Sequence, residues 1–163
     1  MPRYVRQYDR YSCGPVAIIN ALKWCGRSYS LKNDLRKFQH ACRCGYMHGT
    51  RMSDLDWVLR KFIPSTFVVK RKRYPVIGDI EKHLKVGGIV ILNFAWKDKI
   101  GNIGHYMVCD KMTNSGRKFR LVNGRRKRTL IAVRRKGFVH NLHRRKYNGQ
   151  CASWPTAWFV AKK

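Results

Sequence analysis

The sequence predicts an α+β fold in which an N-terminal helical half packs on a C-terminal antiparallel β-sheet. Apolar residues recur at helical spacing up to residue 87, and after it the pattern changes to short β-rich runs separated by Gly and Asn turns. At 163 residues, and with plentiful aromatic side chains, the chain is long enough to bury a sizeable core. No repeat or low-complexity linker divides it, so we expect one domain, 1–163.

Helices are expected in the first half, at 13–26, 30–38, 52–62 and 79–87. The first is closed by Gly26, the second is capped by Ser30, and the third is capped by Ser53 or Asp54.

Strands are expected at 65–70, 88–96, 104–112 and 116–124. Two further runs, 129–135 and 156–162, are expected to form two more strands, or a strand and the end of a helix.

The charge of the chain is strongly one-sided. Thirty-six Lys and Arg face eight Asp and Glu, which gives a formal charge of +28. The last acidic residue is Asp110, and the 53 residues after it contain 16 Lys or Arg. Such a charge repels itself unless a polyanion screens it, and nucleic acid is the commonest polyanion. We therefore expect a nucleic-acid partner.

Four basic runs are the candidate nucleic-acid contacts, because phosphate binding needs charge more than order. They are Lys70, Arg71, Lys72 and Arg73; Arg125, Arg126, Lys127 and Arg128; Arg134, Arg135 and Lys136; and Arg144, Arg145 and Lys146. Aromatic residues nearby, such as Tyr74 and Trp154, could stack on bases. A solubilising basic surface is the alternative interpretation.

No targeting or membrane-spanning segment is predicted. The N-terminal ten residues lack the apolar stretch of a signal peptide. The longest apolar run, at 87–96, is about half of the roughly 20 residues that a membrane helix needs. We expect an intracellular protein, or one carried inside a virion, whose six cysteines are thiols.

Cys13 is the candidate nucleophile. It stands with Gly14 and Pro15 at the predicted start of the first helix, where backbone N–H groups and the helix dipole favour a thiolate. Gly14 leaves room for a peptide bond to approach the sulfur. A turn that merely buries a thiol is the alternative interpretation.

A cysteine nucleophile needs a base, a group that orients the base, and an oxyanion donor. His105 follows Gly104 at the head of a β-rich run and is the candidate base. Asn123, at the end of the next run, could orient its ring; Asp110 is a second candidate for that role. Gln7, together with the Cys13 amide, could hold the oxyanion.

These blocks together resemble the bacteriocin-processing, double-glycine leader peptidase family of papain-like cysteine proteases. The resemblance covers roughly residues 4–124, and the basic part at 125–163 is less family-like. It implies that Cys13 is the nucleophile, His105 the general base and acid, and Gln7 the oxyanion donor. Asn123, followed by Gly, falls where the family carries Asp followed by Pro. The resemblance implies a papain-like fold and a peptide or protein substrate.

We also expect Gly14 and Gly104 to border the bound substrate. The expected chemistry needs no cofactor and no metal. One cluster nevertheless leaves a zinc site open, because His40, Cys42, Cys44 and His48 lie within nine residues. The Cys-x-Cys spacing is tighter than structural zinc sites use, so free thiols and loop histidines are the favoured interpretation.

The sequence thus predicts a cysteine endopeptidase with a Cys-His-Asn triad. The competing hypothesis is a non-enzymatic basic protein that binds nucleic acid, or a virion structural protein, on a peptidase-like scaffold. A nucleophile used for isopeptidase or acyl-transfer chemistry is a third possibility.

Overall fold

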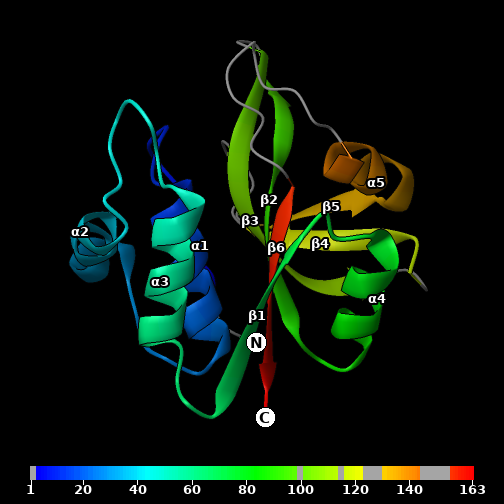
Figure 1. Cartoon of the computed structure of the whole chain (residues 1–163), viewed down its shortest axis with the longest axis horizontal. Coiled ribbons are helices and arrows are strands. Elements are labelled where there is room, and N and C mark those ends of the chain that lie inside the picture. Colours follow the sequence, from blue (N-terminus) through cyan, green and yellow to red (C-terminus); the bar gives the residue numbers. More distant parts are fainter. Residues whose placement is uncertain (1–2, 99–100, 114–115, 123–129, 144–154) are drawn as a thin grey trace.

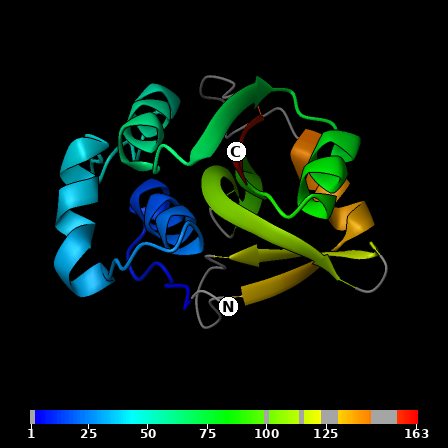
Figure 2. The same cartoon turned by 90° about the horizontal axis from the view of Figure 1, so that it is seen from below.

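The computed structural model describes residues 3–98, 101–113, 116–122, 130–143 and 155–163. Within them, helices and strands follow one another in the order α1, α2, α3, β1, α4, β2, β3, β4, β5, α5, β6. The N-terminal helices α1 to α3 lie on one side of the sheet and α4 and α5 on the other (Figure 1). The view from below shows the same division (Figure 2).

The three helices of the first half lie close to where the sequence predicts them. They are α1 (Cys13–Trp24), α2 (Leu31–Ala41) and α3 (Met52–Phe62). Ser30 caps α2 as expected, because its hydroxyl accepts a hydrogen bond from the Asn33 N–H at 3.2 Å. The expected cap of α3 is wrong: the helix begins at Met52, and its N-cap residue is Arg51.

Gly26 closes α1 as predicted. Its φ of +83° is in the left-handed region. This conformation lets the Gly26 N–H bond to the Lys23 carbonyl at 3.1 Å and the Arg27 N–H bond to the Leu22 carbonyl at 2.9 Å. That pair of hydrogen bonds is the Schellman motif, which glycine favours because it has no Cβ to clash.

The sheet has six strands in the described part of the chain. They are β1 (Phe67–Arg73), β2 (Ile89–Asp98), β3 (Gly101–Thr113), β4 (Lys118–Val122), β5 (Leu130–Arg134) and β6 (Thr156–Lys162). Their spatial order is β1-β6-β2-β3-β4-β5, and neighbouring strands are antiparallel. The C-terminal strand therefore inserts between β1 and β2.

Two helices cover the second face of the sheet. The predicted α4 (Ile77–Lys85) is present. The sequence did not predict a whole helix at α5 (Arg135–His143), because two cations and Gly137 in its first turn hide an apolar face.

The core consists of two clusters, one on each face of the sheet. In β3, Tyr106 and Val108 pack with α1, whereas Met107 and Cys109 pack with residues of α4 and α5. This alternation is the period of two that a strand imposes on its side chains. Helix α1 is enclosed on nearly all sides, since ten of its twelve residues are buried. Among the described residues, no helix has both the length and the apolar character needed to cross a bilayer.

Candidate active site

The turn before α1 is held by Asp9. Its Oδ1 accepts hydrogen bonds from the N–H of Tyr11 at 3.0 Å and of Ser12 at 2.7 Å. Its Oδ2 accepts from the hydroxyl of Ser12, which in turn accepts from Gln39 Nε2 at 2.7 Å. An Asp that accepts from backbone N–H groups two and three residues ahead sets the entry angle of the helix. The role of Asp9 was not predicted from the sequence, although an Asp four positions before a helix start is a usable signal.

Cys13 is the first residue of α1, and its side chain is buried, with 8% of the residue exposed. Burial raises the pKa of its thiol to about 11. Hydrogen bonds from backbone N–H groups, the largest from Tyr106, lower that pKa but do not offset the burial. The backbone N–H groups favour the thiolate, as expected, but burial has the larger effect, so a base that takes the proton would activate the sulfur.

A cavity of about 390 Å³ opens beside Cys13. It is lined by Cys13, His48, Gly49, Thr50, Arg51, Met52, Asn93 and Tyr106. The Tyr106 hydroxyl donates a hydrogen bond to the Thr50 carbonyl at 3.1 Å and so joins β3 to the loop before α3. The cavity is thus bounded by the mouth of α1, this loop, and strands β2 and β3.

His105 lies on β3 directly before Tyr106 and is buried, with 4% exposed. Its Cα pairs with that of Phe94 across the β2–β3 hairpin. The backbone N–H of Tyr106 donates a hydrogen bond to the Cys13 sulfur, so the His105 backbone lies beside Cys13. The described residues that line the cavity include the histidine His48.

Gln7 connects to the same turn. Its Nε2 lies 3.4 Å from Asp9 Oδ1, the oxygen that also holds the N–H groups of Tyr11 and Ser12. The candidate oxyanion donor is therefore tied to the turn that positions Cys13.

Of the two candidates for orienting His105, Asp110 and Asn123, the structure describes the contacts of Asp110. The Asp110 carboxylate is engaged by the Arg120 guanidinium, with Nε at 2.7 Å, and by the Tyr4 hydroxyl at 2.9 Å. Both of its oxygens thus accept hydrogen bonds from Arg120 or Tyr4. Asn123 lies outside the described residues.

The two glycines expected to border the substrate lie in α1 and in β3. Gly14 is buried, and a Cβ added there would lie 2.6 Å from the Thr50 Oγ1. The missing side chain thus makes room for Thr50. Gly104 pairs with Ala95 in the β2–β3 hairpin.

The predicted nucleic-acid contacts fall into separate groups. Lys70 to Arg73 lie on the edge strand β1, and Arg134 to Lys136 lie where β5 meets α5. The runs at 125–128 and 144–146 lie outside the described residues.

The cysteine and histidine cluster at 40–48 does not gather in space. Cys42 is buried in the core, and the Cys44 thiol donates to the Tyr11 carbonyl at 3.3 Å. Throughout the described ranges, no three His, Cys, Asp or Glu side chains are grouped so that they could hold a metal ion.

Among solved structures, the fold is similar to those of C39-like peptidase domains. Over 100% of both chains it is similar to the peptidase domain of Streptococcus ComA, a bifunctional ABC transporter of a quorum-sensing pathway, with a TM-score of 0.70 and 15% identity. A C39-like peptidase from Bacillus anthracis gives 0.65 at 14% identity, covering 98% of this chain and 94% of that one. The peptidase domain of Streptococcus mutans ComA gives 0.60 at 13%, covering 98% of both. No family model and no curated protein matches the sequence.

Proposed function

We propose that the protein is a cysteine peptidase whose nucleophile is Cys13. The observation that carries the proposal is the position of this residue: it opens a buried helix and borders a cavity, in a fold similar over its full length to peptidase domains. The remaining cysteines of the described part do not combine a helix start with such a cavity.

The proposed reaction follows from the protonation state of the sulfur. Because the pKa of Cys13 is about 11, His105 takes the thiol proton as Sγ attacks the carbonyl carbon of the scissile peptide. The oxyanion accepts hydrogen bonds from the Gln7 amide and the Cys13 N–H. His105 gives the proton to the leaving amine, and a thioester remains. Water then hydrolyses the thioester, which releases the acid and restores the thiol.

The proposed reaction requires the His105 ring to reach the Cys13 sulfur. The peptide N–H between His105 and Tyr106 contacts the sulfur, so the His105 backbone lies beside Cys13. Its ring must come within hydrogen-bond reach of Sγ, directly or through one water, when substrate is bound. Catalytic hydrogen bonds commonly tighten only in that complex. We assign the orientation of the ring to Asn123, as in other papain-like enzymes.

Two exposed apolar side chains lie on the loop beside the cavity. The loop that supplies His48 to Met52 also carries Tyr46, 74% exposed, and Met47, 88% exposed. Large apolar side chains this exposed are typical of binding surfaces. We infer that a peptide lies along this loop and places an apolar side chain against it.

A peptidase-directed vinyl sulfone probe tests the proposal. We expect the native protein to be labelled at Cys13 at least about tenfold faster than at Cys25, whose thiol is half-buried and has a pKa of about 12. Peptide mapping by mass spectrometry locates the label. Cys13→Ala should abolish fast labelling, whereas Cys25→Ala should leave it unchanged.

Slow labelling of both thiols at one common rate would refute the peptidase. It would favour the non-enzymatic alternative, a basic binding protein on a peptidase-like scaffold. The control is urea-unfolded protein, in which both cysteines should react alike.

A further inference from the structure

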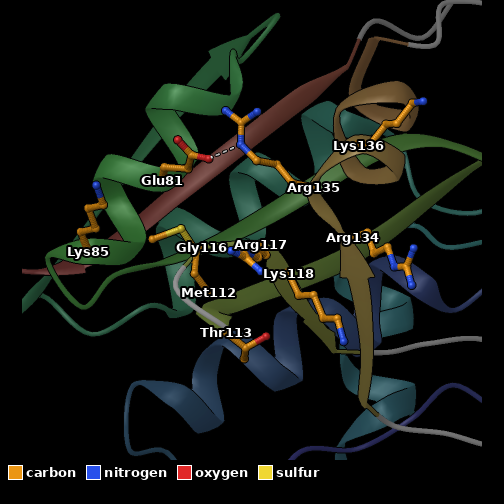
Figure 3. A pocket seen from close by; sticks show the side chains of 10 residues that line it. All are labelled: Glu81, Lys85, Met112, Thr113, Gly116, Arg117, Lys118, Arg134, Arg135 and Lys136. Carbon is orange, nitrogen blue, oxygen red and sulfur yellow. Dashed lines mark hydrogen bonds and ion pairs between the residues drawn. The ribbon is translucent and has the colours of Figure 1, made fainter.

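A hollow lined by cations lies on the side of the sheet opposite to α1, between α4, the facing ends of β3 and β4, and the junction of β5 with α5 (Figure 3). Its volume is about 970 Å³. It is lined by Glu81, Lys85, Met112, Thr113, Gly116, Arg117, Lys118, Arg134, Arg135 and Lys136. Six of these ten residues are Lys or Arg, and one is acidic.

The acidic residue leaves most of that charge unmatched. Glu81 Oε1 accepts from Arg135 Nε at 2.8 Å, and this pair bridges α4 and α5 (Figure 3). Among the residues that the structure describes, the other five cations of the hollow have no carboxylate partner. Most of them are exposed, so they are available to a ligand.

Two of these cations are cross-strand neighbours at the edge of the hollow, on positions that alternate with Phe119 and Val133. Lys118 of β4 and Arg134 of β5 are paired in the strand register. Like charges directly opposite each other on neighbouring strands destabilise a sheet. An anion seated between them would turn this repulsion into attraction.

The positive charge continues beyond this hollow. On the other side of α4, a second hollow of about 620 Å³ is lined by Lys70, Arg71, Lys72 and Lys82, and its single acid, Asp79, pairs with Lys72 at 2.7 Å. Helix α4 contributes Lys82 to one hollow and Lys85 to the other. Cations thus flank α4 on both sides. Together they cover a larger area than one small anion could contact.

We propose that the hollow between α4 and α5 binds the phosphate backbone of a nucleic-acid strand. Phosphates repeat along a strand at about 3.4 Å of duplex axis, so several cations can be engaged at once. The guanidinium groups of Arg117 and Arg134 present forked donors that match phosphate oxygens. A concave site admits a strand but not a flat membrane surface. This binding does not depend on Cys13.

Fluorescence anisotropy with a labelled 20-nucleotide single strand tests the proposal. The test variant is Arg117→Gln/Lys118→Gln/Arg134→Gln, which removes three cations from the hollow. The matched control is Arg27→Gln/Lys32→Gln/Arg36→Gln, which removes three exposed cations from the helical half. Both variants lower the net charge by the same amount. Comparing them therefore distinguishes binding at the hollow from attraction by the overall positive charge of the protein.

We expect the test variant to lose about tenfold or more in affinity, and the slope of log K against log salt to become shallower by about 2, since each lost single-strand phosphate contact contributes about 0.7. The control should change affinity by less than about twofold. Equal losses in both variants, or binding by wild type that does not vary with salt, would overturn the proposal. The proposal would also be overturned if polyglutamate, at the same concentration of charge, competed as strongly as the unlabelled strand.

Misfolding of the test variant is checked independently. Because Lys118→Gln removes a like-charge pair, its thermal midpoint should equal or exceed that of wild type. Cys13→Ala should bind the strand as wild type does, which separates this proposal from the peptidase proposal.

Discussion

The backbone N–H of Tyr106 donates a hydrogen bond to the sulfur of Cys13. The contact joins the first residue of α1 to the middle of β3, two elements that lie about ninety positions apart in the sequence. The sulfur is therefore fixed by the packing of the helical half against the sheet, and several variants test how it is held and how it reacts.

The pH dependence of Cys13 alkylation follows from its raised pKa. Because that pKa is about 11, the thiolate fraction of the free protein grows about tenfold for each pH unit between 7 and 10. The rate of carboxamidomethylation at Cys13 by iodoacetamide, followed by peptide mapping, should rise in the same proportion. A rate that is already flat near pH 7 would show a thiolate at neutral pH and contradict the effect of burial.

Asp9→Ala should destabilise the start of α1. It removes the acceptor of the Tyr11 and Ser12 N–H groups, which should lower the free energy of unfolding by about 1 kcal/mol, within the range of helix-cap losses. Urea unfolding measures the change. Asp9→Asn keeps one acceptor oxygen and should recover most of the loss; equal stability of Asp9→Ala and wild type would contradict the assigned role.

Gly14→Ala should displace the Thr50 side chain. The added Cβ would lie 2.6 Å from Thr50 Oγ1, so the crowded site should lose about 1–3 kcal/mol of unfolding free energy. Gly78→Ala in α4 is the matched control, because nothing lies within 4 Å of its added Cβ. This control should be neutral or stabilising by up to about 1 kcal/mol. If both variants unfold at the same urea concentration, Gly14 is not a packing position.

Asp56 carries a buried hydrogen bond as well as a surface ion pair. Its Oδ1 accepts from Trp158 Nε1 at 2.9 Å, and its Oδ2 pairs with Arg60 at 3.0 Å. Asp56→Ala leaves the buried indole N–H unsatisfied and should lose about 1–3 kcal/mol. Arg60→Ala removes only the exposed ion pair and should change unfolding by less than about 1 kcal/mol. If both variants lost a comparable free energy of unfolding, the ion pair with Arg60, and not the hydrogen bond to Trp158, would account for the stabilisation by Asp56.

Much of the fold could be predicted from local signals in the sequence. Three such signals are the apolar run of α1, the N-cap residue Ser30 and the glycine that ends α1, Gly26. Each depends only on residues a few positions away, so each can be recognised in the sequence. The insertion of β6 between β1 and β2 could not be read, because strand order depends on contacts between distant segments. Helix α5 was not predicted as a whole helix, because its first turn is charged.

The site was predictable in part. The residue types around Cys13 suggested its chemistry, but the state of its thiol depends on burial, which the sequence does not display. The walls of the cavity, such as Asn93 and Thr50, come from segments with no motif of their own.

The rate at which the vinyl sulfone probe labels Cys13 at pH 7 in His105→Ala and in His48→Ala is the most direct test of the proposed base. We expect His105→Ala to label about 100-fold more slowly than wild type, a typical loss for a general base, while His48→Ala stays within about twofold. Circular dichroism confirms that both variants are folded. Wild-type labelling in His105→Ala, or loss of labelling in His48→Ala alone, would contradict the assignment of His105.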